Sequence, residues 1–142
     1  MLTQSTIAFV GSGAMAEAMI SGLLTRDMAT AERLIAAGPR EERGRALAEK
    51  FGVRWTTKNT EAVAAADIVV LGVKPQVLSR VLPELAGRIQ PEALVLSIAA
   101  GVRIETITQG LGHVNVVRSM PNTPAQIGEG ITVWRAASAV SS

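Results

Sequence analysis

The chain has 142 residues, of which 48% are hydrophobic and 18% charged, and it contains no cysteine. This length accommodates one domain of roughly 100–200 residues with a core of its own. The lack of cysteine excludes disulfides and thiolate zinc sites, and a formal net charge of +2 gives no indication of a nucleic-acid partner.

The apolar stretch at residues 7–24 resembles a signal peptide or a short membrane-spanning helix in composition. However, no basic residue precedes it, Glu17 interrupts it, and three glycines and two serines dilute it. A secretory signal needs a positively charged start and an unbroken apolar centre, and a spanning helix needs about 20 apolar residues. We therefore expect a cytoplasmic protein with no membrane partner.

Short apolar runs alternate with longer helical patterns along the whole chain. Strands are expected at residues 6–10, 34–37, 53–56, 68–71, 93–98, 114–117 and 131–134. Helices are expected at residues 14–24, 41–51, 61–66 and 104–111, together with one that Pro75 opens and Gly87 ends. Strands that are apolar throughout are typical of a parallel sheet covered on both faces. The pattern predicts an α/β fold of the Rossmann type, a doubly wound and mostly parallel sheet with helices on both faces.

A glycine-rich motif lies between the first expected strand and the first expected helix. The residues Gly11, Ser12, Gly13, Ala14, Met15 and Ala16 match the dinucleotide-binding pattern G-x-G-x-x-G/A. Gly11 permits the tight turn, Gly13 lets the backbone approach a diphosphate, and Ala16 allows close packing of helix on strand. The helix N-terminus then favours the anion. The alternative interpretation is a plain glycine turn in an α/β fold.

The end of the second expected strand indicates which dinucleotide is preferred. Binders of NAD usually carry a carboxylate there for the ribose 2′-hydroxyl, but residues 36–40 contain none and include Gly38, Pro39 and Arg40. Arg40 and Arg43 are suited to a 2′-phosphate, which favours NADP(H) and leaves NAD(H) possible. Alternatively, both arginines only solvate the first turn of the helix, and the neighbouring Glu41 and Glu42 weaken the positive potential.

Three further loops are expected at the carboxyl ends of strands, where a doubly wound sheet binds its ligand. The first holds Val73, Lys74 and Pro75, of which Lys74 either contacts the cofactor or is an ordinary surface lysine. The second ends in Ala99, Ala100 and Gly101, small residues against which a flat nicotinamide ring can lie. The third contains Pro121, Asn122 and Thr123, which form either a polar corner of a site or only a turn.

Other catalytic chemistry has little support in the sequence. His113 is the single histidine and is expected to be structural, and Asp67 is expected in a turn. No serine has a plausible base beside it, and no cluster of His, Asp and Glu is expected to hold a metal. A hydride-transfer enzyme does not need these groups, because the cofactor carries the chemistry.

Four segments together resemble pyrroline-5-carboxylate reductases: residues 7–15, 73–75, 95–102 and 118–124. The combination of Ser-Ile-Ala-Ala-Gly and Met-Pro-Asn-Thr-Pro is more specific than the glycine motif, which other imine and hydroxyacid reductases share. The resemblance implies NAD(P)H-dependent reduction of 1-pyrroline-5-carboxylate to L-proline, a step of proline biosynthesis. It also implies that residues 11–15 hold the diphosphate and residues 73–75 line the cofactor cleft. Residues 99–101 would meet the nicotinamide, and residues 121–123 would form the edge of the imine substrate site.

The resemblance further implies a second, helical domain that makes a homo-oligomer and grips the substrate carboxylate, and the sequence holds no such segment. We expect residues 1–134 to form the NAD(P)-binding domain and residues 135–142 to begin a linker. The chain is then an N-terminal piece of a longer protein or a truncated gene product, inactive or weakly active alone. Two alternatives remain: an NADP-binding module without activity of its own, and a related imine or β-hydroxyacid reductase.

Overall fold

A computed structural model describes residues 5–98, 102–113 and 115–118 of the chain. Within these residues, six parallel strands form one sheet in the order β3-β2-β1-β4-β5-β6. The strands are β1 (Ile7–Val10), β2 (Leu34–Ala37), β3 (Arg54–Thr56), β4 (Ile68–Leu71), β5 (Leu94–Ser97) and β6 (Val116–Arg118). The order reverses at β1, since β2 lies on one side of it and β4 on the other. This arrangement confirms the predicted doubly wound, parallel Rossmann-type sheet.

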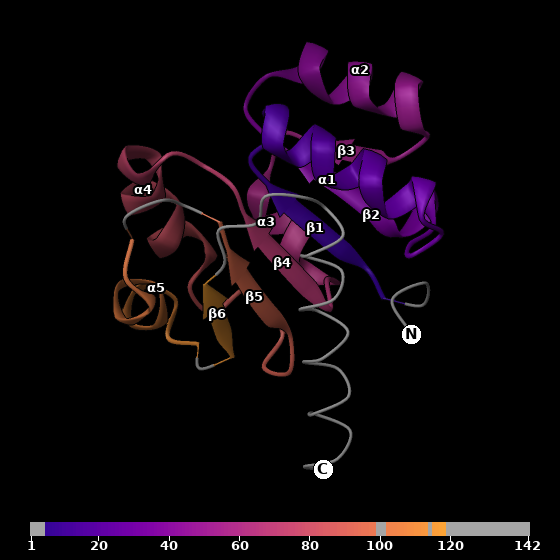
Figure 1. The fold of residues 1–142 in the computed structure, drawn as a ribbon. Coiled ribbons are helices and arrows are strands. Elements are labelled where there is room, and N and C mark those ends of the chain that lie inside the picture. The colour runs from indigo at the N-terminus through magenta and orange to yellow at the C-terminus, as the bar shows by residue number, and fades with distance from the viewer. Residues whose placement is uncertain (1–4, 99–101, 114, 119–142) are drawn as a thin grey trace, which may run out of the picture.

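The helices connect successive strands and lie on both faces of the sheet (Figure 1). They are α1 (Ala14–Thr25), α2 (Glu41–Phe51), α3 (Asn59–Ala64), α4 (Pro75–Leu85) and α5 (Ile104–Leu111), with a short 3-10 turn, η2 (Ala31–Arg33), before β2. Alternate residues of each strand face opposite sides. Ile7 and Phe9 therefore pack with α1 and α2, whereas Ala8 and Val10 pack with α3, α4 and α5.

Burial on both faces explains why β1, β4 and β5 show no alternation of apolar and polar residues. All four residues of β1, β4 and β5 are buried, because helices exclude water from both faces.

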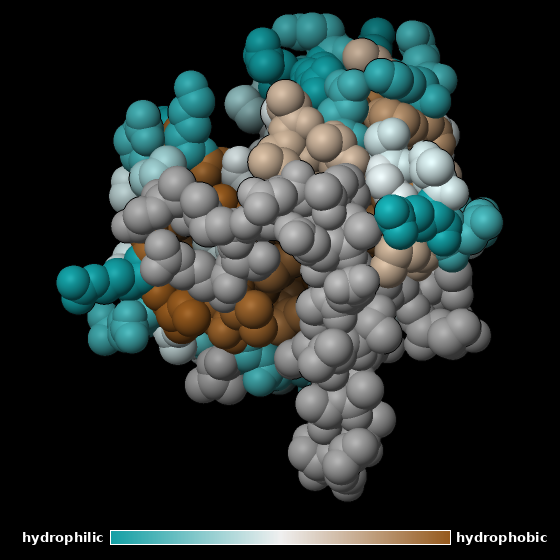
Figure 2. Space-filling view, in the orientation of Figure 1, coloured by the Kyte–Doolittle hydropathy of each residue, from teal (hydrophilic) through white to brown (hydrophobic). Residues whose placement is uncertain are grey.

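The outer surface of α2 is hydrophilic, whereas apolar surface shows beside α5 and β6 (Figure 2). Ile104 on α5 and Val117 on β6 are among the large apolar side chains that stay exposed. No described helix has the length and apolar character that crossing a membrane requires.

Four predicted elements have the expected bounds, namely 34–37, 41–51, 68–71 and 104–111, and seven others are present with ends that differ by one or two residues. The strand predicted at 53–56 begins at Arg54, and the last described strand is Val116–Arg118, whereas 114–117 was predicted. The helix predicted at 61–66 is Asn59–Ala64. It begins early because the Thr56 hydroxyl accepts a bond from the Lys58 N–H and donates one to Glu61. The strand predicted at 131–134 and the linker at 135–142 lie outside the described residues.

Two structural expectations about single residues are confirmed. His113 is buried, and its Nε2 donates to the Ala93 carbonyl oxygen at 2.6 Å, so it fastens the end of α5 to the start of β5. Asp67 precedes β4 and accepts a hydrogen bond from the Thr6 N–H at 2.8 Å. Both residues lie at the amino end of the sheet. Neither contributes a side chain to the opposite, carboxyl end, where the loops after the strands meet.

Candidate nucleotide-binding site

Three loops lie next to one another at the carboxyl end of the sheet. In the parallel register Val10 is level with both Ala37 and Leu71, so β2, β1 and β4 end at the same height. The loops that follow hold residues 11–13, 38–40 and 72–74. Because β1 lies between β2 and β4 and the chain leaves it first in one direction and later in the other, these loops border the crevice of a doubly wound sheet.

Gly11 is required by the fold itself. Its φ is +104°, a conformation that residues with a side chain rarely adopt. A Cβ there would lie 2.9 Å from the Gly72 carbonyl carbon and 3.0 Å from the Val73 nitrogen. The Gly11 N–H donates to the Ala37 oxygen at 2.9 Å, and the Gly72 N–H donates to the Val10 oxygen at 2.9 Å. Gly11 therefore joins the loops after β1, β2 and β4.

Gly13 differs, because nothing within the described residues requires a glycine there. It precedes α1 in an extended conformation (φ −79°, ψ −164°), and a Cβ at this position would have no neighbour within 4 Å. Gly13, Ala14 and Met15 are exposed. The first N–H groups of a helix have no intrahelical partner, and no side chain caps this one. The missing Cβ therefore leaves open the space in front of free N–H donors, as close approach of a diphosphate requires.

Gly38 leaves space for Ser12. A Cβ on Gly38 would overlap the Ser12 hydroxyl oxygen, so the glycine allows the Ser12 side chain to lie against the end of β2. Gly38 also donates its N–H to the Thr56 oxygen at 3.2 Å. Pro39 and Arg40 follow, both exposed, and Arg40 is the residue before α2. No described side chain forms an ion pair with Arg40, whose guanidinium therefore remains available to an anion.

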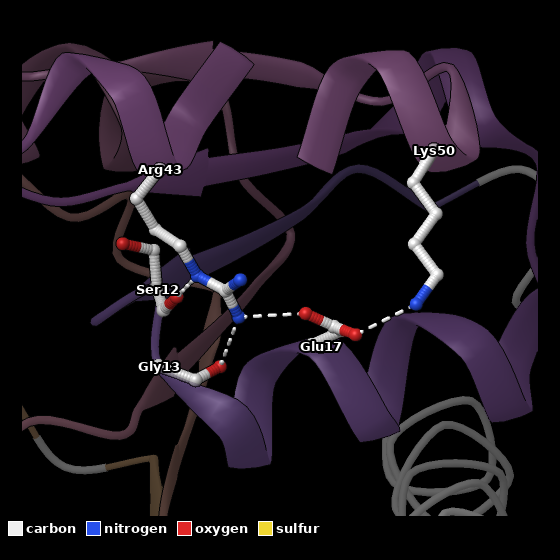
Figure 3. A network of polar contacts seen from close by, with 5 residues as sticks. All are labelled: Ser12, Gly13, Glu17, Arg43 and Lys50. Carbon is white, nitrogen blue, oxygen red and sulfur yellow. Dashed lines mark hydrogen bonds and ion pairs between the residues drawn. The ribbon is translucent and has the colours of Figure 1, made fainter. Parts of the chain in front are cut away.

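Arg43, in contrast, is already engaged within the protein (Figure 3). Its Nε donates to the Ser12 carbonyl oxygen at 2.6 Å, and its Nη2 donates to the Gly13 carbonyl oxygen at 3.2 Å. The same Nη2 lies 2.8 Å from Glu17 Oε1, and Lys50 Nζ lies 2.9 Å from Glu17 Oε2. Hydrogen bonds from Lys50 and then from Arg43 lower the pKa of the Glu17 carboxyl below its ordinary value.

A groove of about 680 Å³ runs between α1 and α2. Gly13 and Arg40 line it where the two helices begin, Glu17 and Arg43 line it in the middle, and Lys50 and Phe51 line it near the end of α2. The groove thus opens beside the glycine-rich loop. Its cationic side chains outnumber the single carboxylate of Glu17, which makes it a suitable surface for a phosphorylated ligand.

The loop after β4 lies beside the glycine-rich loop. Val73 Cγ1 would be 3.1 Å from a Cβ placed on Gly11, so the two loops are in contact. Lys74 is exposed just before α4, and its carbonyl oxygen accepts the N–H groups of Val77 and Leu78. Pro75 occupies the first turn of α4, where a missing N–H costs nothing. The predicted residues of this loop and of the glycine-rich loop therefore come together.

The remaining predicted contacts lie outside the described residues. They are Ala99, Ala100 and Gly101 for the nicotinamide, and Pro121, Asn122 and Thr123 for the substrate edge. The described chain before residue 99 ends with β5, whose last residue, Ser97, is buried, and with Ile98, whose N–H donates to the Leu71 oxygen at 3.1 Å. Within the described parts of the chain, no group of three or more His, Asp or Glu residues could hold a metal ion.

The sequence interpretation missed the connection from Arg43 through Glu17 to Lys50. Glu17 counted there only as an interruption of an apolar stretch. One signal was present: Arg43 and Lys50 are seven residues apart, which is two turns and therefore one face of α2. What no spacing could supply is the side-by-side placement of α1 and α2 that brings Glu17 within reach of both cations.

Known proteins resemble this chain throughout the described region. Residues 6–101 match the family described as NADP oxidoreductase coenzyme F420-dependent. The pyrroline-5-carboxylate reductase of Vibrio alginolyticus is 41% identical over 127 residues, which make up 89% of this chain and 46% of that protein. The chain thus spans about half the length of the curated relatives it matches.

Solved structures are also similar to this chain over most of its length and over about half of their own. A pyrroline-5-carboxylate reductase from Coxiella burnetii superposes with a TM-score of 0.77 at 34% identity, over 87% of this chain and 46% of that one. The pyrroline carboxylate reductase of Plasmodium falciparum, solved with NADP bound, gives a TM-score of 0.74 at 26% identity over 89% and 46% of the two chains. Since the family match at residues 6–101 covers more than half of its 142 residues, the chain belongs to the NADP oxidoreductase coenzyme F420-dependent family.

Proposed function

We propose that the chain binds NADP(H) at the carboxyl end of β1 and is the cofactor-binding half of an enzyme that reduces 1-pyrroline-5-carboxylate to L-proline. The observation that carries the proposal is Gly13. Neither its conformation nor its neighbours among the described residues need a glycine, yet it precedes the N-terminus of α1, which no side chain caps. A bound diphosphate explains both features, because it needs close backbone approach and free N–H donors.

In this proposal the loops after β2 and β4 contact the other parts of the cofactor. Gly38 and Pro39 would lie along the adenosine ribose at the end of β2, and Arg40 would pair with its 2′-phosphate. No carboxylate stands there to accept a ribose 2′-hydroxyl, which favours NADP(H) over NAD(H). Val73, Lys74 and Pro75 would line the cleft beyond the diphosphate, toward residues 99–101 and the nicotinamide.

The substrate assignment is supported by relatives named pyrroline-5-carboxylate reductase. When bound, the reduced nicotinamide supplies the hydride for the carbon of the C=N bond. If that imine is protonated, its positive charge prepares the carbon to accept hydride, and the protein need not supply an acid. The residues of this chain then have to orient the cofactor and shield it from water, which fits loops that present mostly backbone and small side chains. A substrate-site edge at residues 121–123, a second domain that grips the substrate carboxylate, a homo-oligomer formed through that domain, and a cytoplasmic location remain part of the proposal.

Two measurements test the proposal in order. Isothermal titration calorimetry with NADPH and NADH should show binding of both, with NADPH the tighter ligand. A pyrroline-5-carboxylate reduction assay should then give little or no turnover with this chain alone and clear turnover when it is extended by the second half of the Vibrio alginolyticus relative. Failure to bind either dinucleotide would refute the whole proposal. Binding without turnover in both forms would favour the binding module without activity.

A further inference from the structure

We propose that Arg43 is a positioning residue for the cofactor diphosphate, acting from behind the glycine-rich loop and not by contact with the 2′-phosphate. The inference rests on the proposed function, because it concerns the same site. Arg43 belongs to α2, whereas the loop that it contacts joins β1 to α1. Its side chain is only about a quarter exposed, and its guanidinium contacts the Ser12 and Gly13 carbonyls and Glu17 within the protein (Figure 3).

The two hydrogen bonds of Arg43 help to hold the loop peptides in one orientation, together with the Glu17 N–H, which also donates to the Gly13 oxygen at 3.1 Å. Arg43 binds the carbonyl oxygens of Ser12 and Gly13, at 2.6 and 3.2 Å. In a trans peptide the carbonyl and the following N–H point in opposite directions, and the described chain has no cis peptide bond. With these carbonyls turned toward Arg43, the N–H groups of Gly13 and Ala14 point away from it. That direction is the exposed side, where Gly13 leaves its Cβ position open.

The charge next to this loop depends on the same side chain. Glu17 lies one turn into α1, and its carboxylate would repel a diphosphate at the start of that helix. Arg43 and Lys50 each pair with one oxygen of Glu17, so the three side chains together carry one net positive charge. Arg43 therefore helps to direct two peptide N–H groups outward and also offsets the charge of the Glu17 carboxylate.

This role makes a specific distinction between Arg43 and Arg40. NADPH and NADH share the diphosphate and differ in the 2′-phosphate. A residue that positions the diphosphate loop affects both dinucleotides equally, whereas a residue that pairs with the 2′-phosphate affects NADPH alone. Arg43 has the contacts of the first kind, and Arg40, exposed and without an ion-pair partner among the described residues, has the setting of the second.

The test compares Arg43→Ala, Arg43→Lys and the matched variant Arg40→Ala, with NADPH and NADH titrated against each by calorimetry. Arg43→Ala should weaken both dinucleotides by the same factor, about tenfold, because two charge-assisted hydrogen bonds to the loop are lost. The NADPH-to-NADH affinity ratio should stay at the wild-type value. Arg43→Lys should recover part of both affinities, since a lysine can still pair with Glu17 and donate to one carbonyl.

Two further readouts separate positioning from charge and from general stability. Amide NMR signals of Gly13 and Ala14 should shift on addition of saturating NADH in the wild type and less so in Arg43→Ala, whose circular dichroism spectrum should still be that of the folded chain. In Arg43→Ala combined with Glu17→Ala, affinity should remain below that of the single Glu17→Ala variant. Should Arg43→Ala fail to fold, Arg43→Lys read by the affinity ratio and the same two amide signals carries the test.

Each contrary result has a definite meaning. A loss confined to NADPH would place Arg43 at the 2′-phosphate and overturn the inference, as would no loss for either dinucleotide. Full recovery in the double variant would reduce the role of Arg43 to neutralising Glu17, which also overturns positioning. If the wild type binds neither dinucleotide, the proposed function fails first, and that outcome is visible before any variant is made.

Discussion

The glycines around the candidate site are explained by different structural requirements. Gly11 is required by a positive φ and by the backbone of residues 72 and 73 lying about 3 Å from its missing Cβ. Gly38 makes space for a neighbouring side chain. Gly13 has no such reason within the described chain, and this contrast between glycines of one motif separates the needs of folding from the needs of binding.

The two glycines of the loop should therefore respond in opposite ways to the same substitution. Gly13→Ala should change the free energy of unfolding by less than about 1 kcal/mol, because reduced unfolded-chain entropy offsets a poorer helix cap. It should nonetheless weaken NADPH by about tenfold or more, since the methyl group enters the ligand space. Gly11→Ala should cost about 1–3 kcal/mol from backbone strain alone. Urea unfolding measures the free energy of unfolding of each variant, and calorimetry measures its affinity for NADPH. A stable Gly13→Ala variant with wild-type affinity would contradict the proposed position of the diphosphate.

Arg40 is the residue on which the preference for NADP(H) depends. Arg40→Ala should weaken NADPH by about 10- to 100-fold, the usual cost of losing a charge-assisted hydrogen bond, and leave NADH almost unchanged. The matched control is Arg54→Ala, an exposed arginine at the start of β3 and so at the amino end of the sheet, which should affect neither ligand. Equal losses of NADPH and NADH in Arg40→Ala would remove Arg40 from this role.

At the scale of elements, the site depends on how α1 and α2 are held together. Both helices pack on the same face of the sheet through Leu23 and Leu47, among other side chains. Their outer sides are joined by Glu17, which contacts Arg43 near the start of α2 and Lys50 near its end. These partly exposed ion pairs contribute little stability singly, but they fix the side chains that border the groove.

This connection should depend on pH in a predictable direction. The pKa of Glu17 is lowered below 4.5 by hydrogen bonds from Lys50 and Arg43, so the folded chain binds fewer protons there than the unfolded chain. The contribution of Glu17 to stability is therefore complete above about pH 4.5 and is lost as the pH falls through the lowered pKa. The difference in urea midpoint between wild type and Glu17→Gln should be constant near neutral pH and shrink in acid. Glu49→Gln, an exposed carboxylate on α2, is the control; a difference that grows in acid would contradict this sign.

At the scale of the whole molecule, the sheet separates two apolar layers. One holds Ile20 of α1 with α2, and the other holds Ile107 of α5 with α3 and α4; both isoleucines are fully buried. The strands contribute alternate side chains to each layer, so side chains of one layer do not pack with those of the other.

The two layers should consequently behave independently on mutation. Ile20→Val and Ile107→Val should each cost about 0.5–1.5 kcal/mol, the usual result of removing one buried methylene. Together they should cost the sum to within about 0.5 kcal/mol, because the sites share no packing partner. Equilibrium urea unfolding of the single and double variants provides the comparison. A coupling energy clearly larger than this would mean that the sheet transmits packing changes from one layer to the other.

The sequence predicted the fold well because its signals are local and strong. Uniformly apolar strands such as Ile68–Leu71, the αL glycine that ends α2 at Gly52, and the proline that opens α4 each specify an element from a few neighbouring residues. The error at α3 arose from the bonds of Thr56 with Lys58 and Glu61, which no apolar periodicity reveals. The contacts expected at residues 99–101 and 121–123 stay predictions, because they lie outside the described residues.

Sequence alone therefore determined the alternation of strands and helices, the doubly covered sheet and the glycine-rich loop after β1, since these follow from local conformation and from hydrophobic pattern. The tertiary structure decided which polar side chains meet. It brought Arg43 to the Ser12 and Gly13 carbonyls and Glu17 to Lys50, contacts between residues 30–33 positions apart in the chain. It also left Arg40 exposed. The physical reason is that a side chain finds a distant partner only after two helices have packed on the sheet, and the geometry of that packing is set by the core and not by the polar residues themselves.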